Sequence, residues 1–221
     1  MYYQFLIEDR STDKLVNHIM KKLDKQYAEK EILWNTKFFG GIGHLRKGGS
    51  ALEQKTGKLL NDLPMYMKAF DKVLQNMDYA TLIIVLDNDK RDVEQFRQQL
   101  KNVVVSNMIL CDHVFCIAVK EMEAWLLGDT EAIKAAYPNA KMQYIKRYEQ
   151  DAICETWEIL ADIVYPQGLS GLKKKAGGSY SEIGKAKCEW ADKIGGHLHL
   201  HGNASPSYRY FIDEVEKRIL A

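Results

Sequence analysis

The chain has 221 residues, of which 46% are hydrophobic and 28% are charged, and its formal net charge is +1. This balance is typical of a soluble globular protein and excludes a disordered chain, a collagen-like fibre and a coiled coil. The longest apolar run covers residues 82–86, far short of the roughly 18 residues that span a membrane, and Glu8 leaves no room for a signal peptide. We therefore expect one elaborated domain in a cytoplasmic protein that has no membrane partner.

Strands and helices alternate in the first 75 residues. Residues 2–7 are predicted to form a strand, and a helix capped by Ser11 or Thr12 should follow, because apolar residues then recur at helical spacing as far as Leu23. A second strand is predicted at residues 31–39, before a glycine-rich loop at residues 40–49. A helix is expected from about residue 51 to residue 75, with a break at Pro64.

The next segment contains the most apolar stretch of the chain, TLIIVL at residues 81–86. A continuous run of this kind is typical of a strand that is buried on both faces of a parallel sheet. A helix through Phe96 and Leu100 is predicted after it, followed by two strands at residues 103–110 and 114–119 and a helical segment at residues 121–129. This alternation predicts an α/β fold with a mainly parallel sheet flanked by helices.

After Pro138 the pattern becomes helical. Helices are predicted at residues 152–164, 181–194 and 208–220, with lysine-rich and glycine-rich linkers between the first two. We expect residues 1–137 to form the α/β core and residues 138–221 to form a helical extension packed on it, so that the whole chain is a single domain.

Basic residues gather in two segments of an otherwise acidic chain. Residues 35–60 and 166–188 each contain five lysines or arginines and one glutamate, so their joint net charge is +8 and the rest of the chain carries −7. Basic loops beside an acidic cluster suit a polyanion held over metal-binding carboxylates. The alternative is that these cations only face solvent. The residues expected to hold a nucleic-acid backbone are Arg46, Lys47, Lys173, Lys174, Lys175 and Lys185.

Two aspartates directly follow the apolar strand, in the sequence Asp87-Asn88-Asp89. Side chains two positions apart on a strand point to the same side, and the carboxyl ends of the strands are where open α/β sheets bind ligands. Two carboxylates held close together repel each other, and a magnesium ion would relieve that repulsion with the oxygen ligands that it prefers. The alternative is that Asp89 or Asp92 only caps the next helix.

Three further acids are expected at the same edge. Glu8 ends the first predicted strand, and if the two strands are neighbours, their ends lie only about 5 Å apart. Glu121 and Glu123 follow the strand predicted at residues 114–119. Trp125 could anchor their helix in the core.

The order of these features resembles the Toprim arrangement, in which a strand ending in glutamate, a helix and a strand ending in D-x-D follow one another. Toprim domains occur in topoisomerases, primases, recombination proteins and the overcoming-lysogenization-defect nucleases. The segments IEDRSTDKLV, LIIVLDNDKRD, AVKEMEAWLLGD and NASPSYRYF look closer still to a bacterial Toprim-related family of uncharacterised proteins that are often encoded beside ABC-type ATPases. The resemblance extends from Tyr3 to about Phe211. It includes one departure, because many Toprim proteins have glycine where this chain has Asp9.

The resemblance implies a Toprim-like fold with a phosphoryl-transfer site that depends on Mg²⁺ or Mn²⁺. Asp87 and Asp89 would hold the metal, Glu8 would be a metal ligand or the general acid/base, and these three would be the catalytic residues. Glu121 and Glu123 would complete a second metal position. The implied function is hydrolysis of nucleic-acid phosphodiesters, together with an ABC-type ATPase partner and, by genomic analogy, in defence against phage.

Two other functions stay open at this point, and an oligomer is compatible with each. The chain could be a scaffold or regulatory subunit that binds an ATPase; Asp9 and Arg10 after Glu8 favour this, and the full set of acids opposes it. A receiver-like or phosphatase-like domain would use Asp87 as a phospho-acceptor. That domain would also need a lysine and a threonine or serine at strand ends, which the sequence does not place.

Three other patterns do not support a function. Gly49 stands where a P-loop needs lysine, so ATP binding of that type is not expected. His197, His199 and His201 alternate in HLHLH, for which zinc binding is one interpretation and a surface turn is the one we prefer. The cysteines form no zinc spacing and no C-x-x-C pair, which favours reduced thiols; they are Cys111, Cys116, Cys154 and Cys188.

Overall fold

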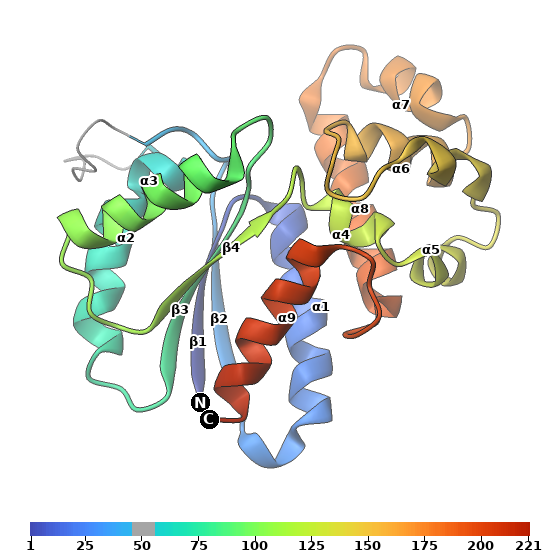
Figure 1. The fold of residues 1–221 in the computed structure, drawn as a ribbon. Helices are drawn as coiled ribbons and strands as arrows, with labels where there is room; N and C mark the ends of the chain where they lie inside the picture. The colour runs from blue at the N-terminus through green and yellow to red at the C-terminus, as the bar shows by residue number, and fades with distance from the viewer. Residues whose placement is uncertain (46–55) are drawn as a thin grey trace.

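The residues described in this computed structural model are 1–45 and 56–221 (Figure 1). Their centre is a four-stranded sheet in the order β2-β1-β3-β4, in which every neighbouring pair is parallel. The strands are β1 (Tyr2–Ile7), β2 (Leu33–Phe38), β3 (Ala80–Asp87) and β4 (His113–Ala118). The predicted α/β class with a mainly parallel sheet is confirmed, and it is consistent with a Toprim-like α/β fold.

Helices cover both faces of the sheet (Figure 1). On one face, α2 (Leu59–Leu74) and α3 (Val93–Ser106) share a core with alternate residues of β3, namely Leu82, Ile84 and Leu86. On the other face, α1 (Arg10–Gln26) and α9 (Pro206–Ile219) share a core with Phe5, Ile7 and Val85. Because β3 has a strand on each side and helices on both faces, all eight of its residues are buried.

The remaining helices form a group beside the carboxyl ends of the strands (Figure 1). They are α4 (Glu123–Leu127), α5 (Thr130–Ala136), α6 (Thr156–Val164), α7 (Gly168–Ala176) and α8 (Tyr180–His197), with short 3₁₀ turns at Ala28–Lys30 and Met142–Arg147. Trp125 of α4 and Trp190 of α8 belong to the same hydrophobic core as Phe5 of β1. The helical residues after 137 therefore share one core with the sheet. No helix within residues 1–45 and 56–221 has the length and apolar character that a membrane crossing needs.

Three local predictions were wrong. Residues 103–110 are not a strand, because α3 continues to Ser106 and buries Val103 in the row of Phe96 and Leu100. Pro64 does not break its helix: α2 begins at Leu59, so Pro64 lies in its second turn, where burial of the surrounding apolar side chains holds the helix together. Residues 168–176 are a helix rather than a linker, and α7 ends at Gly177, whose left-handed φ of 54° suits glycine.

Two of the family-like segments are joined by a clamp between α4 and the start of α9. The indole N–H of Trp125 donates to Ser207 Oγ (3.0 Å), and Asn203 Nδ2 donates to the carbonyl of Trp125 (2.8 Å). The Trp125 ring stacks on Phe211 with a centroid distance of 5.3 Å. Trp125 thus anchors its helix in the core, and the motif has a structural role besides its two glutamates.

The clamp requires glycine at position 128. A Cβ there would lie 2.1 Å from Asn203 Oδ1 and 3.0 Å from the backbone nitrogen of Ser205. We expect Gly128→Ala to lower the free energy of unfolding by about 2–3 kcal/mol, measured by urea denaturation. Gly184→Ala in α8 is the control, since its Cβ would meet nothing within 4 Å and should leave stability unchanged or slightly raised. Equal stability of the two variants would show that the clamp can be loosened without cost.

Candidate functional site

Glu8 and Asp87 lie side by side at the carboxyl edge of the sheet. Strand β1 pairs directly with β3, as the predicted site requires. The backbone N–H of Glu8 donates to the carbonyl of Val85 (3.2 Å), and the backbone N–H of Asp87 donates to Glu8 Oε2 (3.0 Å). Asp87 is 9% exposed. The parallel pairing therefore fixes two carboxylates at adjacent strand ends.

Glu123 and Lys187 complete this group from the helical part. Glu123 at the start of α4 is fully buried, and Lys187 Nζ of α8 lies 3.2 Å from its Oε1. Within the described residues, neither carboxylate oxygen of Glu123 has a hydrogen-bond partner, so this ion pair is its main compensation. We refer to Glu8, Asp87, Glu123 and Lys187 as the inner cluster.

The carboxyl groups of the inner cluster have raised pKa values, which favour their protonated, neutral forms. Burial, and then the charge of Glu8, raises the pKa of Asp87 well above its usual range. Burial likewise raises the pKa of Glu8 to about 7 and that of Glu123 to about 7, with further contributions from neighbouring carboxylates. Burial alone would lower the pKa of Lys187, but the carboxylates of Glu123 and Asp87 raise it, so this ammonium stays charged.

Asp89 and Glu121 lie in a more open group. Strand β3 ends at Asp87, and Asp89 follows it in the left-handed conformation (φ 48°), so strand alternation does not extend to it. Arg91 lies 2.8 Å from the Asp89 carboxylate, and the Glu121 carboxylate accepts hydrogen bonds from the backbone N–H (3.0 Å) and the hydroxyl of Thr156. Asp89 and Glu121 line a hollow of about 480 Å³ together with Lys90, Arg91 and Cys154. We call this the outer group.

Asp9, directly after Glu8, has a structural role. Asp9 caps α1: its carboxylate accepts the backbone N–H of Thr12 (2.8 Å) and the hydroxyl of Ser11 (2.9 Å). The backbone N–H of Gly41 donates to the carbonyl of Glu8 (3.1 Å). The loop after β2 therefore reaches the edge where Glu8 lies.

The donor chemistry of the inner cluster fits a hard cation. Its ligands would be carboxylate oxygens. Burial disfavours the ionised forms of Glu8 and Asp87, and the charge of Glu8 adds to this effect at Asp87. Among the described residues, Oε2 of Glu123 has no hydrogen-bond partner. In the part of the chain that is described, no three acidic, histidine or cysteine side chains are grouped closely enough to hold an ion by themselves. Magnesium commonly binds through one or two carboxylates and completes its shell with water and substrate phosphate, and Glu8 and Asp87 offer two such carboxylates.

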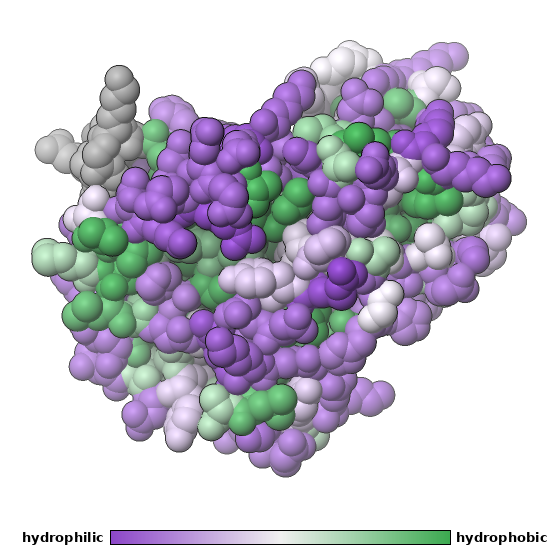
Figure 2. Space-filling model, viewed as in Figure 1, coloured by the Kyte–Doolittle hydropathy of each residue, from purple (hydrophilic) through white to green (hydrophobic). Residues whose placement is uncertain are grey.

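The predicted phosphate-binding lysines lie on α7 and α8. Lys173, Lys174 and Lys175 form the exposed last turn of α7, and Lys185 pairs with Glu182 on the surface of α8. Figure 2 shows the molecule hollowed at its upper rim, between the α/β part and the helical part, with hydrophilic residues along the hollow. Arg46 and Lys47 lie outside the described residues.

Lys187 is the site residue that the sequence reasoning missed, and Lys90 and Arg91 of the outer group were also left out. One signal for Lys187 was present: it precedes Ala191 and Ile194 by four and seven residues, and both are fully buried on α8. A lysine in the buried row of a helix needs an anionic partner. The sequence could not say which acid that would be.

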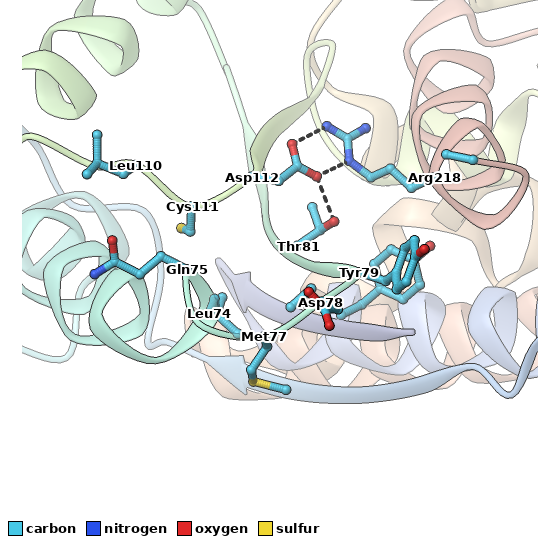
Figure 3. Close-up of a pocket in the computed structure, with 13 residues that line it drawn as sticks. Leu74, Gln75, Met77, Asp78, Tyr79, Thr81, Leu110, Cys111, Asp112 and Arg218 are labelled. Atoms are coloured by element: carbon cyan, nitrogen blue, oxygen red, sulfur yellow. Dashed lines mark hydrogen bonds and ion pairs between the residues drawn. The ribbon is translucent and has the colours of Figure 1, made fainter.

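The histidines of the HLHLH segment and the acid at the opposite edge of the sheet pair with other residues. His199 Nδ1 lies 2.9 Å from Asp129, and His201 Nε2 lies 3.3 Å from Glu216, so these histidines do not converge on one ion. A second hollow, of about 410 Å³, lies at the opposite edge of the sheet, and Figure 3 draws the residues that line it. There Arg218 and Thr81 both bond to Asp112. The Asp112 carboxylate in this hollow is therefore compensated by Arg218 and Thr81, unlike those of Glu8 and Asp87.

Comparison with known proteins places the chain in a family. A family model described as a domain of unknown function, DUF4276, matches residues 7–216. The chain belongs to the DUF4276 family. None of the curated proteins and none of the solved structures matches it. The match covers both strand-end acids and Lys187, so the inner cluster lies wholly within the DUF4276 domain.

The raised pKa of Glu8 predicts a pH-dependent stability. Native Glu8 holds its proton to about pH 7, whereas the unfolded residue releases it near 4.5, so the native state is penalised as the pH rises through this window. Glu8→Gln should therefore raise the free energy of unfolding at pH 7.5 without divalent ions, by up to about 3 kcal/mol. The gain should shrink toward pH 4.5, in thermal melts followed by circular dichroism. A gain that does not depend on pH would contradict a buried, titrating Glu8.

Proposed function

We propose that this DUF4276 protein hydrolyses phosphodiester bonds of nucleic acid in the cytoplasm, with Mg²⁺ or Mn²⁺ at the inner cluster. The observation that carries the proposal is the pairing of Glu8 and Asp87 at adjacent strand ends, with their ionised forms disfavoured until a cation arrives. Such strongly perturbed carboxylates at the ligand-binding edge of a parallel sheet are typical of a functional site.

The metal would be held by Glu8 and Asp87, with Glu123 close by and Asp89 and Glu121 available from the outer group. A divalent ion bound there supplies an activated water and neutralises the charge that develops on the phosphate. The chain's own carboxylates fit that role because they are acceptor-only oxygen ligands once ionised.

Two residues of the inner cluster have further roles. Instead of ligating the ion, Glu8 can act as the general base: its pKa of about 7 lets it take a proton from the attacking water at neutral pH. Its Oε2 accepts the N–H of Asp87, which leaves Oε1 for that exchange. Lys187 carries a positive charge among the carboxylates. It can turn from Glu123 to a phosphate oxygen when substrate binds.

The nucleic-acid backbone would follow the hollow between the two parts of the molecule. Lys90 and Arg91 lie beside Asp89 in the outer group, and the lysines of α7 extend the positive charge on the helical side. Cations spaced in this way position a backbone without reading its sequence. Arg46 and Lys47, which lie outside the described residues, stay predicted contacts from the sequence.

We also propose that an ABC-type ATPase is the protein partner and that the pair acts in phage defence. The support for both is the family-like segments of the sequence, which remain an analogy. The second candidate is a non-catalytic scaffold that binds the ATPase. The Lys187–Glu123 ion pair favours it, because an ammonium already compensates part of the buried negative charge.

The test of the enzyme is Asp87→Asn. With Mg²⁺ or Mn²⁺, and with the ATPase partner supplied if required, the wild type should cleave labelled DNA or RNA, and the variant should be slower by about 100-fold or more, because an amide cannot replace the anionic ligand. The ion should also raise the melting temperature of the wild type and not that of the variant. Asp78→Asn at the opposite, exposed edge is the matched control and should keep both properties. A wild type that shows neither cleavage nor metal stabilisation would support the scaffold.

The basic turn of α7 gives a separate prediction for binding. Replacing its three lysines by alanine should weaken nucleic-acid binding and reduce the slope of log K against log salt by up to about 3, since fewer counterions are released. Fluorescence anisotropy across a salt series measures this. Unchanged slopes would mean that the turn only faces solvent. The controls are alanine substitutions of Lys21, Lys25 and Lys30, in and just after α1.

A further inference from the structure

Strand β2 is an edge strand, and among the described residues no strand pairs with its outer flank. In a parallel pair, residues alternate between those that bond to the neighbouring strand and those that turn away from it. Leu33 N–H donates to the carbonyl of Met1, and Phe39 N–H donates to that of Ile7, so the odd-numbered residues face β1. The backbone groups of Trp34, Thr36 and Phe38 therefore face outward, and no hydrogen bond to them is found within the described residues.

The open edge carries apolar side chains and little protection. Leu33 is 57% exposed and Phe38 is 43% exposed. Natural edge strands are usually blunted by proline, a bulge, several charges or a covering helix. Strand β2 has no proline, pairs with β1 in an unbroken register and carries a single charge, Lys37. The other edge of the sheet, β4, is packed against α9.

We propose that β2 pairs antiparallel with β2 of a second copy of this chain, about a two-fold axis through Thr36, to form one continuous sheet across both copies. The outward residues would exchange hydrogen bonds in the pairs Thr36 with Thr36 of the partner subunit, and Trp34 with Phe38 of the partner subunit. These positions also lie on one face of the sheet, because they alternate with Leu33, Asn35 and Lys37. In this register the outward-facing backbone groups pair with each other, and the side chains of the paired residues lie on the same face of the sheet.

The side chains select this register. Centred on Thr36, it sets Trp34 opposite the ring of Phe38 of the partner subunit at both ends of the pairing, and cross-strand pairs of this kind stabilise sheets. Lys37 meets Asn35. Moving the centre one residue toward the C-terminus would oppose Lys37 with itself, and moving it one residue the other way would oppose Leu33 with Lys37. A second copy is thus the occupant whose side chains match the edge, and the inference is independent of the proposed function.

Thr36→Pro tests the pairing while sparing the fold, because the N–H that it removes faces outward and proline is tolerated at such edge positions. The wild type should have about twice the 25.4 kDa chain mass in light scattering coupled to gel filtration, and Thr36→Pro should have the mass of one chain. Thr36→Ala keeps the N–H and should stay a dimer. A monomeric wild type, or a dimeric Thr36→Pro, would overturn the proposal.

A cross-link gives a second test that does not depend on proline. In an antiparallel pair, two directly opposite residues that exchange hydrogen bonds have Cα atoms about 5.5 Å apart, which is within the range that a disulfide spans. Thr36→Cys should form a disulfide-linked dimer on mild oxidation, visible on a non-reducing gel and lost with reductant. Tyr180→Cys, which is strongly exposed on α8, controls for random contact. Equal dimer yields from the two variants would overturn the assigned register.

Discussion

The balance of buried charge around Lys187 is the constraint on which the carboxyl edge of the sheet depends. Its ammonium lies against the fully buried Glu123, near Asp87 and within the field of Asp9 and Glu121. Removing charged groups from water costs several kcal/mol each unless they are paired. The charge that compensates Glu123 is Lys187 of α8, far along the chain. The buried acids of this edge therefore gain their partner only when α8 packs against the rest of the protein.

That docking rests on the core that the sheet and the helical part share. Trp125 stacks on Phe211 and bonds to Ser207, while Asn203 holds the carbonyl of Trp125. The start of α4, which carries Glu123, is thereby fixed relative to α9 and to the sheet. This packing holds Glu8 and Asp87 where burial and neighbouring charges disfavour their ionised forms.

The two edges of the sheet have different chemistry. At the carboxyl edge, acids gather with their pKa values raised by burial and by one another. At the opposite edge Asp112 is bonded by Arg218 and Thr81; burial opposes its ionisation, but these hydrogen bonds lower its pKa. Every strand runs in the same direction, so the asymmetry is a consequence of the parallel topology. The two chain ends lie together at the opposite edge (Figure 1).

The α/β class, the buried strand at residues 81–86 and the strand-end positions of Glu8 and Asp87 could all be predicted from the order of the residues, because local periodicity and the direction of parallel strands decide these features. The same reasoning misassigned residues 103–110, since a short apolar run is stable as helix or strand according to what it packs against, and here Val103 packs as part of α3. It also could not set the conformation of Asp89, which departs from the strand in a left-handed turn. The contact of Lys187 with Glu123 could not be predicted from the sequence, because it joins two helices far apart in the chain and depends on how α8 packs.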